Sequence, residues 1–99
     1  METKITTENE KISIKVSGRL DTLSAAEFEK EIAPVMENDI KEVEIDMSEL
    51  NYISSSGLRS FLIIKKQTGK NGGKLTLKNL THEVKTVFDM TGFTSIFGL

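Results

Sequence analysis

The stretch VEIDMSELNYISSSGLRSFL, residues 43–62, places three serines between two apolar segments of different period. Before the serines, apolar and acidic residues alternate, which predicts a strand over residues 41–50 with one buried face and one acidic face. After them, residues 57–73 have the spacing of an amphipathic helix that ends in a glycine-rich turn. Ser54, Ser55 and Ser56 therefore stand where the chain passes from a strand into a helix.

The start of a helix leaves backbone N–H groups unpaired and carries the positive end of the helix dipole. A serine hydroxyl is a good cap for such an end, and Ser54 is the best candidate, which leaves Ser55 pointing outward. One cap needs only one hydroxyl, whereas the sequence offers three. The same N–H groups also accommodate a phosphate. These residues alone leave two interpretations open, a structural cap and a phosphorylation switch.

Further segments on both sides of this stretch have strand or helix patterns. Alternation predicts strands over residues 11–18 and 74–80, with a shorter first strand over 3–7 and a short last strand over 93–99. Helical spacing predicts helices over residues 21–39 and 81–92, with Gly92 as the stop of the second.

The helix over residues 21–39 has a predicted start and a predicted break. Ser24 and Glu27 fit a capping box, and Leu23 and Phe28 stand where a hydrophobic staple forms. Pro34 is the only proline, and it should kink this helix or end it early because its ring removes a backbone donor.

The predicted element order is β-β-α-β-α-β-α-β within one domain, residues 1–99. Strands separated by helices favour parallel neighbours and right-handed crossovers. Strands covered on both faces would be almost continuously apolar, whereas these alternate. We therefore expect a single α/β domain with a mixed, mostly parallel sheet of four to five strands and helices mainly on one face.

Composition indicates a small globular domain and excludes several classes of protein. Of 99 residues, 37% are apolar and 28% charged, which is typical of a folded domain. The chain has no cysteine, so it has no disulfide framework. Its polar N-terminus is unlike a signal peptide, and its longest apolar run is far below the ~20 residues that span a bilayer. We expect a cytoplasmic protein with no membrane partner.

Charge is distributed unevenly along the chain. Residues 1–50 carry 13 acidic and 6 basic side chains, a net charge of −7, whereas residues 51–99 carry 2 acidic and 7 basic, a net charge of +5. This asymmetry is compatible with electrostatic guidance of a partner, but the favoured interpretation is that the two halves interleave and the charges mix. No basic patch is interleaved with aromatic residues, so direct binding to nucleic acid is not expected.

Nothing in the sequence supports catalysis. The only histidine, His82, fits a surface position in the first turn of a helix, and no Gly-x-Ser-x-Gly segment is present. The segment GKNGGK, residues 69–74, lacks the spacing and the following hydroxyl of a phosphate-binding loop. With no cysteine and scattered carboxylates, no metal set is expected. We expect no enzyme and no cofactor.

Three segments together resemble the STAS family. They are GRLD at 18–21, the stretch 43–62, and VKTVFDMTGFTSIF at 84–97, and they follow one another in the order and spacing of that family. Within the family, they resemble bacterial anti-sigma factor antagonists. The resemblance covers nearly the whole chain, and DMSELNYISSSGLR is its most specific part.

This resemblance implies a mechanism of partner exchange. The antagonist binds an anti-sigma factor that is also a serine/threonine kinase, and this frees the sigma factor. The kinase then phosphorylates a serine at the start of the second helix, which breaks the complex, and a serine phosphatase restores it. The family motif commonly reads Asp-Ser-Ser-Gly-Leu, so alignment on Gly57 and Leu58 makes Ser55 the modified serine. Ser54 then replaces the aspartate.

The resemblance also implies a partner-binding surface, in which Asp21 matches an acidic position of the family. The implied contact residues are Asp21, Ser54, Ser55, Ser56, Gly57 and Leu58. We expect Gly57 to admit the partner's backbone, while Leu58 either covers the core or lies on the rim. The protein is expected to be a monomer or weak dimer.

Two alternatives remain open from the sequence. One is a STAS scaffold, or a subunit of a transport or signalling assembly, that binds a partner without phosphorylation. The other is an enzyme or nucleotide-binding module.

Overall fold

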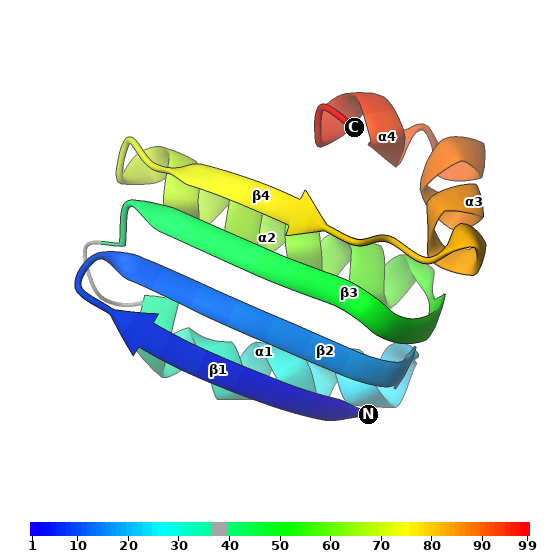
Figure 1. Cartoon of the computed structure of the whole chain (residues 1–99), viewed down its shortest axis with the longest axis horizontal. Coiled ribbons are helices and arrows are strands. Elements are labelled where there is room, and N and C mark those ends of the chain that lie inside the picture. The colour runs from blue at the N-terminus through cyan, green and yellow to red at the C-terminus, as the bar shows by residue number, and fades with distance from the viewer. Residues whose placement is uncertain (37–39) are drawn as a thin grey trace.

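A computed structural model describes residues 1–36 and 40–99, and it shows a four-stranded sheet with helices packed behind it (Figure 1). The elements are β1 (Glu2–Glu8), β2 (Lys11–Leu20), α1 (Thr22–Met36), β3 (Glu42–Ile53), α2 (Ser55–Lys70), β4 (Lys74–Lys78), α3 (His82–Thr91) and α4 (Phe93–Ile96). The predicted α/β class and the predicted order from β1 through α3 are confirmed. None of the described helices is long and apolar enough to cross a bilayer.

The sheet has the strand order β1-β2-β3-β4. β1 pairs with β2 antiparallel, whereas β2 with β3 and β3 with β4 are parallel. The predicted mixed, mostly parallel sheet is therefore confirmed, with four strands. In the register of the central pair, Leu20 lies opposite Ile53, so β2 and β3 end at the same edge of the sheet.

The predicted last strand is wrong, because its residues form the short helix α4. Gly92 ends α3 in a left-handed conformation, with φ of 79°, and this turns the chain back on itself. Phe93 and Phe97 then stand four residues apart with ring centroids 6.0 Å from each other, and Phe97 also packs edge-on against Phe88. The apolar residues of this segment thus fit a helical turn that packs on α3.

The start of α1 also differs from the prediction. The cap is Asp21, whose Oδ1 accepts a hydrogen bond from the Ser24 N–H at 3.0 Å, while the Asp21 N–H donates to the Ser24 Oγ at 2.9 Å. Ser24 is therefore the third helical residue and not the cap. The predicted staple is wrong too, because the Leu23 side chain is 73% exposed. α1 continues through Pro34 to Met36, and the last three residues of the predicted helix lie outside the described residues.

The core lies between the sheet and the helices α1 and α2 (Figure 1). The side chains of β2 and β3 that face the helices are buried: Ile12, Ile14, Val16, Leu20, Val43, Ile45, Met47, Leu50 and Ile53. Phe28 of α1 and Phe61 of α2 are fully buried and meet edge to face, with ring centroids 6.0 Å apart. This aromatic contact joins the two helices above the sheet.

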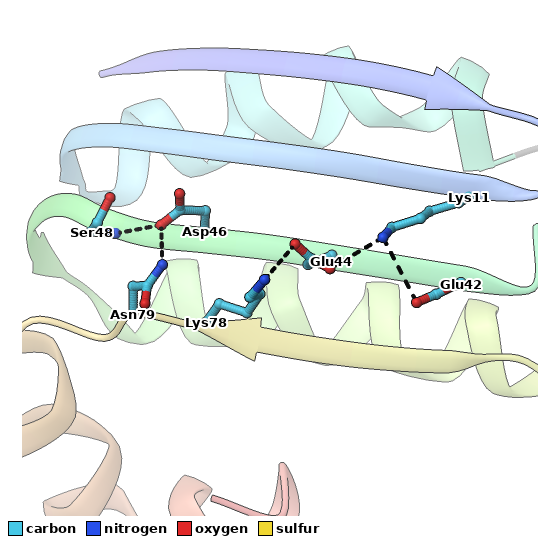
Figure 2. A network of polar contacts seen from close by, with 7 residues as sticks. All are labelled: Lys11, Glu42, Glu44, Asp46, Ser48, Lys78 and Asn79. Atoms are coloured by element: carbon cyan, nitrogen blue, oxygen red, sulfur yellow. Dashed lines mark hydrogen bonds and ion pairs between the residues drawn. The ribbon is translucent and has the colours of Figure 1, made fainter.

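The opposite face of the sheet carries charged side chains (Figure 2). Lys11 Nζ lies 3.3 Å from a Glu44 carboxylate oxygen and 3.9 Å from one of Glu42. Lys78 Nζ lies 3.0 Å from the other oxygen of Glu44, and this contact holds the pKa of the Glu44 carboxyl below its usual value. Glu44 belongs to the acidic half of the chain and Lys78 to the basic half, so at this face the two halves interleave.

At one end of this network, Asp46 of β3 binds Asn79, which follows β4. Asp46 Oδ1 accepts hydrogen bonds from the Ser48 N–H at 2.9 Å and from the Asn79 side-chain amide at 3.2 Å (Figure 2). These donors favour the ionised carboxylate, chiefly the Ser48 N–H, and they lower the pKa of Asp46.

Phe61→Ala should lower the free energy of unfolding by about 3–5 kcal/mol, because it leaves a cavity between α1, α2 and the sheet. Ile63→Ala is the matched control on the same helix, since Ile63 is 45% exposed, and it should cost less than about 1 kcal/mol. Urea denaturation of both variants measures the difference. A loss below about 1 kcal/mol for Phe61→Ala would contradict the placement of this ring in the core.

Candidate functional site

The parallel pairing of β2 and β3 brings two distant segments together at one edge of the sheet. The Ser54 N–H donates to the Leu20 carbonyl oxygen at 2.8 Å, so the residues that follow Leu20 and Ile53 lie side by side. We call Asp21, Ser54, Ser55 and Ser56 the serine edge. The strand ends thus assemble residues that the sequence analysis selected from two separate motifs.

Ser54 is the N-cap of α2, as the sequence predicts. Its backbone is extended, with φ of −91° and ψ of 172°, and its Oγ accepts a hydrogen bond from the Gly57 N–H at 3.2 Å. The Ser54 carbonyl accepts the first intrahelical bond, from the Leu58 N–H at 3.0 Å. The hydroxyl of Ser54 is therefore used by the fold.

Ser55 is the first residue of α2, and it is exposed. Among the described residues, its hydroxyl has no hydrogen-bond partner. Ser56 is partly exposed, and its carbonyl accepts a bond from the Ser60 hydroxyl at 3.1 Å. The Ser56 hydroxyl, like that of Ser55, has no hydrogen-bond partner among the described residues, but Ser55 is the more exposed of the two.

Gly57 and Leu58 are both buried, which for Leu58 selects the core, one of the two positions that the sequence left open, while contact of either residue with a partner stays a prediction. Leu58 is 2% exposed and belongs to the core. Gly57 is buried, and a Cβ built there would lie 2.8 Å from the Ile53 Cγ1 and 2.8 Å from the Leu20 Cγ. The glycine is needed because α2 begins directly against the ends of β2 and β3. Both residues pack in the core beneath the serines and so fix where the serine edge lies.

Asp21 lies at this edge as the cap of α1, a structural role that the sequence analysis did not predict. Its carboxylate accepts hydrogen bonds from the Ser24 N–H and from the Ser24 hydroxyl, and these two bonds lower the pKa of Asp21. The carboxyl group is partly exposed and therefore presents a negative charge next to the serines.

The structure adds two exposed groups to this edge that sequence reasoning missed. The Arg19 guanidinium lies over the Tyr52 ring at 4.2 Å, and these two residues are opposite each other in the register of β2 and β3. Leu23 projects from the first turn of α1. The sequence predicted that Leu23 packs inward as part of a staple, so its exposure was not expected. The Arg19–Tyr52 contact depends on the register between two strands, which neither strand's sequence reveals alone.

An open depression of about 440 Å³ adjoins Asp21. It is lined by Met1, Gly18, Arg19, Asp21, Leu23, Ser24 and Glu27. Within residues 1–36 and 40–99, no group of three or more potential metal ligands occurs. The edge therefore offers a hydroxyl, a carboxylate and apolar area, which suits contact with another protein.

Comparison with known proteins identifies the family. Residues 2–99 match the family described as STAS domain. BtrV of Bordetella bronchiseptica, a candidate anti-sigma factor antagonist, is 37% identical over 82 residues, which cover 83% of this chain and 71% of the relative. The anti-sigma-B factor antagonist of Bacillus subtilis is 30% identical over 88 residues, which cover 89% of this chain and 80% of the relative.

Solved structures share the fold. The unphosphorylated form of the anti-sigma factor antagonist SpoIIAA has a TM-score of 0.82 at 16% identity, covering 99% of this chain and 98% of that one. The phosphorylated form of SpoIIAA from Bacillus has a TM-score of 0.76 at 18% identity, covering 95% and 86%. The similarity confirms the predicted α/β architecture.

Gly57→Ala should destabilise the protein by about 1–3 kcal/mol, because its Cβ would overlap Leu20 and Ile53 in a filled core. Gly69→Ala in the same helix is the matched control. A Cβ at Gly69 meets nothing within 4 Å, so stability should stay the same or rise by up to about 1 kcal/mol. Thermal and urea unfolding compare the two, and equal stabilities would show that α2 does not begin against the strand ends.

Proposed function

The chain belongs to the STAS domain family, and from this premise we propose that it is an anti-sigma factor antagonist that phosphorylation of Ser55 switches off. The observation that carries the proposal is the division of roles at the start of α2. The Ser54 hydroxyl caps the helix, whereas Ser55 is exposed and its hydroxyl makes no hydrogen bond with the described residues. A kinase can therefore modify Ser55 without breaking a bond of the fold.

The names of the relatives support the choice of partner. BtrV is described as a candidate anti-sigma factor antagonist and the Bacillus subtilis protein as an anti-sigma-B factor antagonist, so the proposed partner is an anti-sigma factor. We further propose that this partner is itself the serine/threonine kinase, and that a serine phosphatase reverses the modification. SpoIIAA has been described in both unphosphorylated and phosphorylated forms, which supports the compatibility of this fold with a phosphate.

The physics of the helix start supports a switch that leaves the fold intact. A phosphate on Ser55 adds about −1.5 to −2 charges at the positive end of the α2 dipole, where an anion is tolerated. Ser54 is a neutral cap, so it adds no negative charge beside the phosphate. A partner docked on the serine edge would instead have to bury that dianion, and burying an unpaired charge is costly. Modification is therefore expected to weaken the complex more than the fold.

Ser55→Ala should bind the anti-sigma factor and resist inactivation by the kinase, whereas Ser55→Asp should bind poorly and stay folded. Titration calorimetry against the cognate anti-sigma factor measures binding, and circular dichroism melts should show stability changes within about 1 kcal/mol. Ser95→Asp introduces the same charge at an exposed serine of α4 and serves as the control. Equal binding by the two Ser55 variants would contradict the proposal and favour a scaffold that is not phosphorylated. Phosphate found only on Ser54 or Ser56 would overturn the assignment of the switch to Ser55.

Asp21→Asn should weaken the complex by about tenfold, because it removes an interface charge. Its melting temperature should be nearly unchanged, since asparagine caps a helix about as well as aspartate. Asp21→Ala separates the two roles, because it removes both the charge and the cap and should cost about 1 kcal/mol of stability as well. If calorimetry finds wild-type affinity for Asp21→Asn, the docking surface does not include this carboxylate.

A further inference from the structure

Ser55 and Arg59 stand one turn apart on the outer surface of α2. Both are exposed, whereas Gly57 and Leu58 between them are buried. Residues four apart on a helix lie on the same side, with Cβ atoms about 5–6 Å from each other. The Arg59 side chain is long enough to reach a group attached to the Ser55 hydroxyl.

Arg59 has no partner in the part of the chain that the structure describes. Among residues 1–36 and 40–99, its guanidinium makes no hydrogen bond, ion pair or ring contact. Some other cations of the chain are engaged; for example, Lys78 pairs with Glu44 and Arg19 stacks on Tyr52. The α2 segment itself, SSGLRSFLIIKKQTGK, contains no acidic residue that could compete for Arg59.

We propose that Arg59 is the internal counter-ion of phosphorylated Ser55, an inference that rests on the proposed function. The planar guanidinium matches a phosphate through two parallel hydrogen bonds, which makes it a better partner than a lysine. An anion that precedes a cation by four residues is also the favoured orientation on a helix. Phosphorylation thus changes two features of the docking surface, because it adds the dianion and holds Arg59 against it.

The other charges near Ser55 do not reproduce this effect. Asp21 lies on the adjacent loop and, being negative, opposes ionisation of a phosphate. Arg19 and the N-terminal amine are cations near Asp21, but the Arg19 guanidinium is stacked on the Tyr52 ring, and both charges are present in every variant compared below. Lys65, Lys66 and Lys70 also belong to α2, but Lys65, the nearest of them, follows Ser55 by ten residues, which is about 15 Å along the helix axis. That separation exceeds the screening length of about 8 Å at physiological salt.

The test uses the full chain with phosphoserine installed at position 55 during translation, so that no kinase is needed. Phosphorus NMR follows the second ionisation of the phosphate, which is near pH 6 for an unperturbed phosphoserine. With Arg59 present, the phosphate pKa should be about 0.2–0.4 unit lower than in Arg59→Gln. Lys66→Gln removes the same charge from the same helix and should leave the phosphate pKa within about 0.1 unit of the unsubstituted phosphoprotein.

Two results would overturn the counter-ion inference. One is an unchanged phosphate pKa in Arg59→Gln, and the other is an equal shift in Lys66→Gln, which would reveal a general charge effect. Calorimetry with the same phosphoproteins separates this inference from the proposed function. If phosphorylation abolishes binding to the anti-sigma factor while Arg59→Gln leaves the pKa unchanged, only the counter-ion inference fails. If the phosphoprotein binds as tightly as the unmodified protein, the proposed function fails.

Discussion

The parallel pairing of β2 with β3 is the constraint on which the serine edge depends. Its register places Leu20 opposite Ile53, and the Ser54 N–H bond to the Leu20 carbonyl continues that pairing beyond the end of β3. A shift by one residue would turn the buried side chains of a strand toward solvent, so the core fixes this register. Asp21 and the three serines therefore meet because apolar residues elsewhere in the strands must be buried.

The residues of the edge divide into those that build it and those that are free to act. Gly57 and Leu58 are buried, and Ser54 closes the helix, so these three set where α2 begins. Ser55 and Arg59 face solvent on the same side of α2 and do nothing for the fold in the described structure. A regulatory surface gains from this division, since modification of an exposed residue does not have to disturb the packed ones.

Much of this arrangement follows from sequence patterns, and the exceptions have physical causes. The alternation in β2 and β3 predicts the buried faces, and the cap at Ser54 was predicted because helix starts have known chemistry. Near the start of α1, a capping box fits both Asp21 with Ser24 and Ser24 with Glu27. The sequence pattern favoured the second pair, whereas the structure forms the first. The final segment reads as a strand by composition, but Phe93 and Phe97 bury their rings against α3 as a helix. The close contact of Gly57 with Leu20 is a tertiary fact that no local pattern contains.

The strand order also determines how the sheet meets other molecules at its margin. β4 pairs only with β3 among the described strands, so its far side offers unpaired backbone groups to any extended chain. Such an open margin invites aggregation unless it is short or charged. β4 has only 5 residues, KLTLK, with a lysine at each end, and Lys78 is held in place by Glu44. The Lys78–Glu44 ion pair, which belongs to the polar face of the sheet, thus also keeps a charge at the end of this strand and disfavours self-association through it.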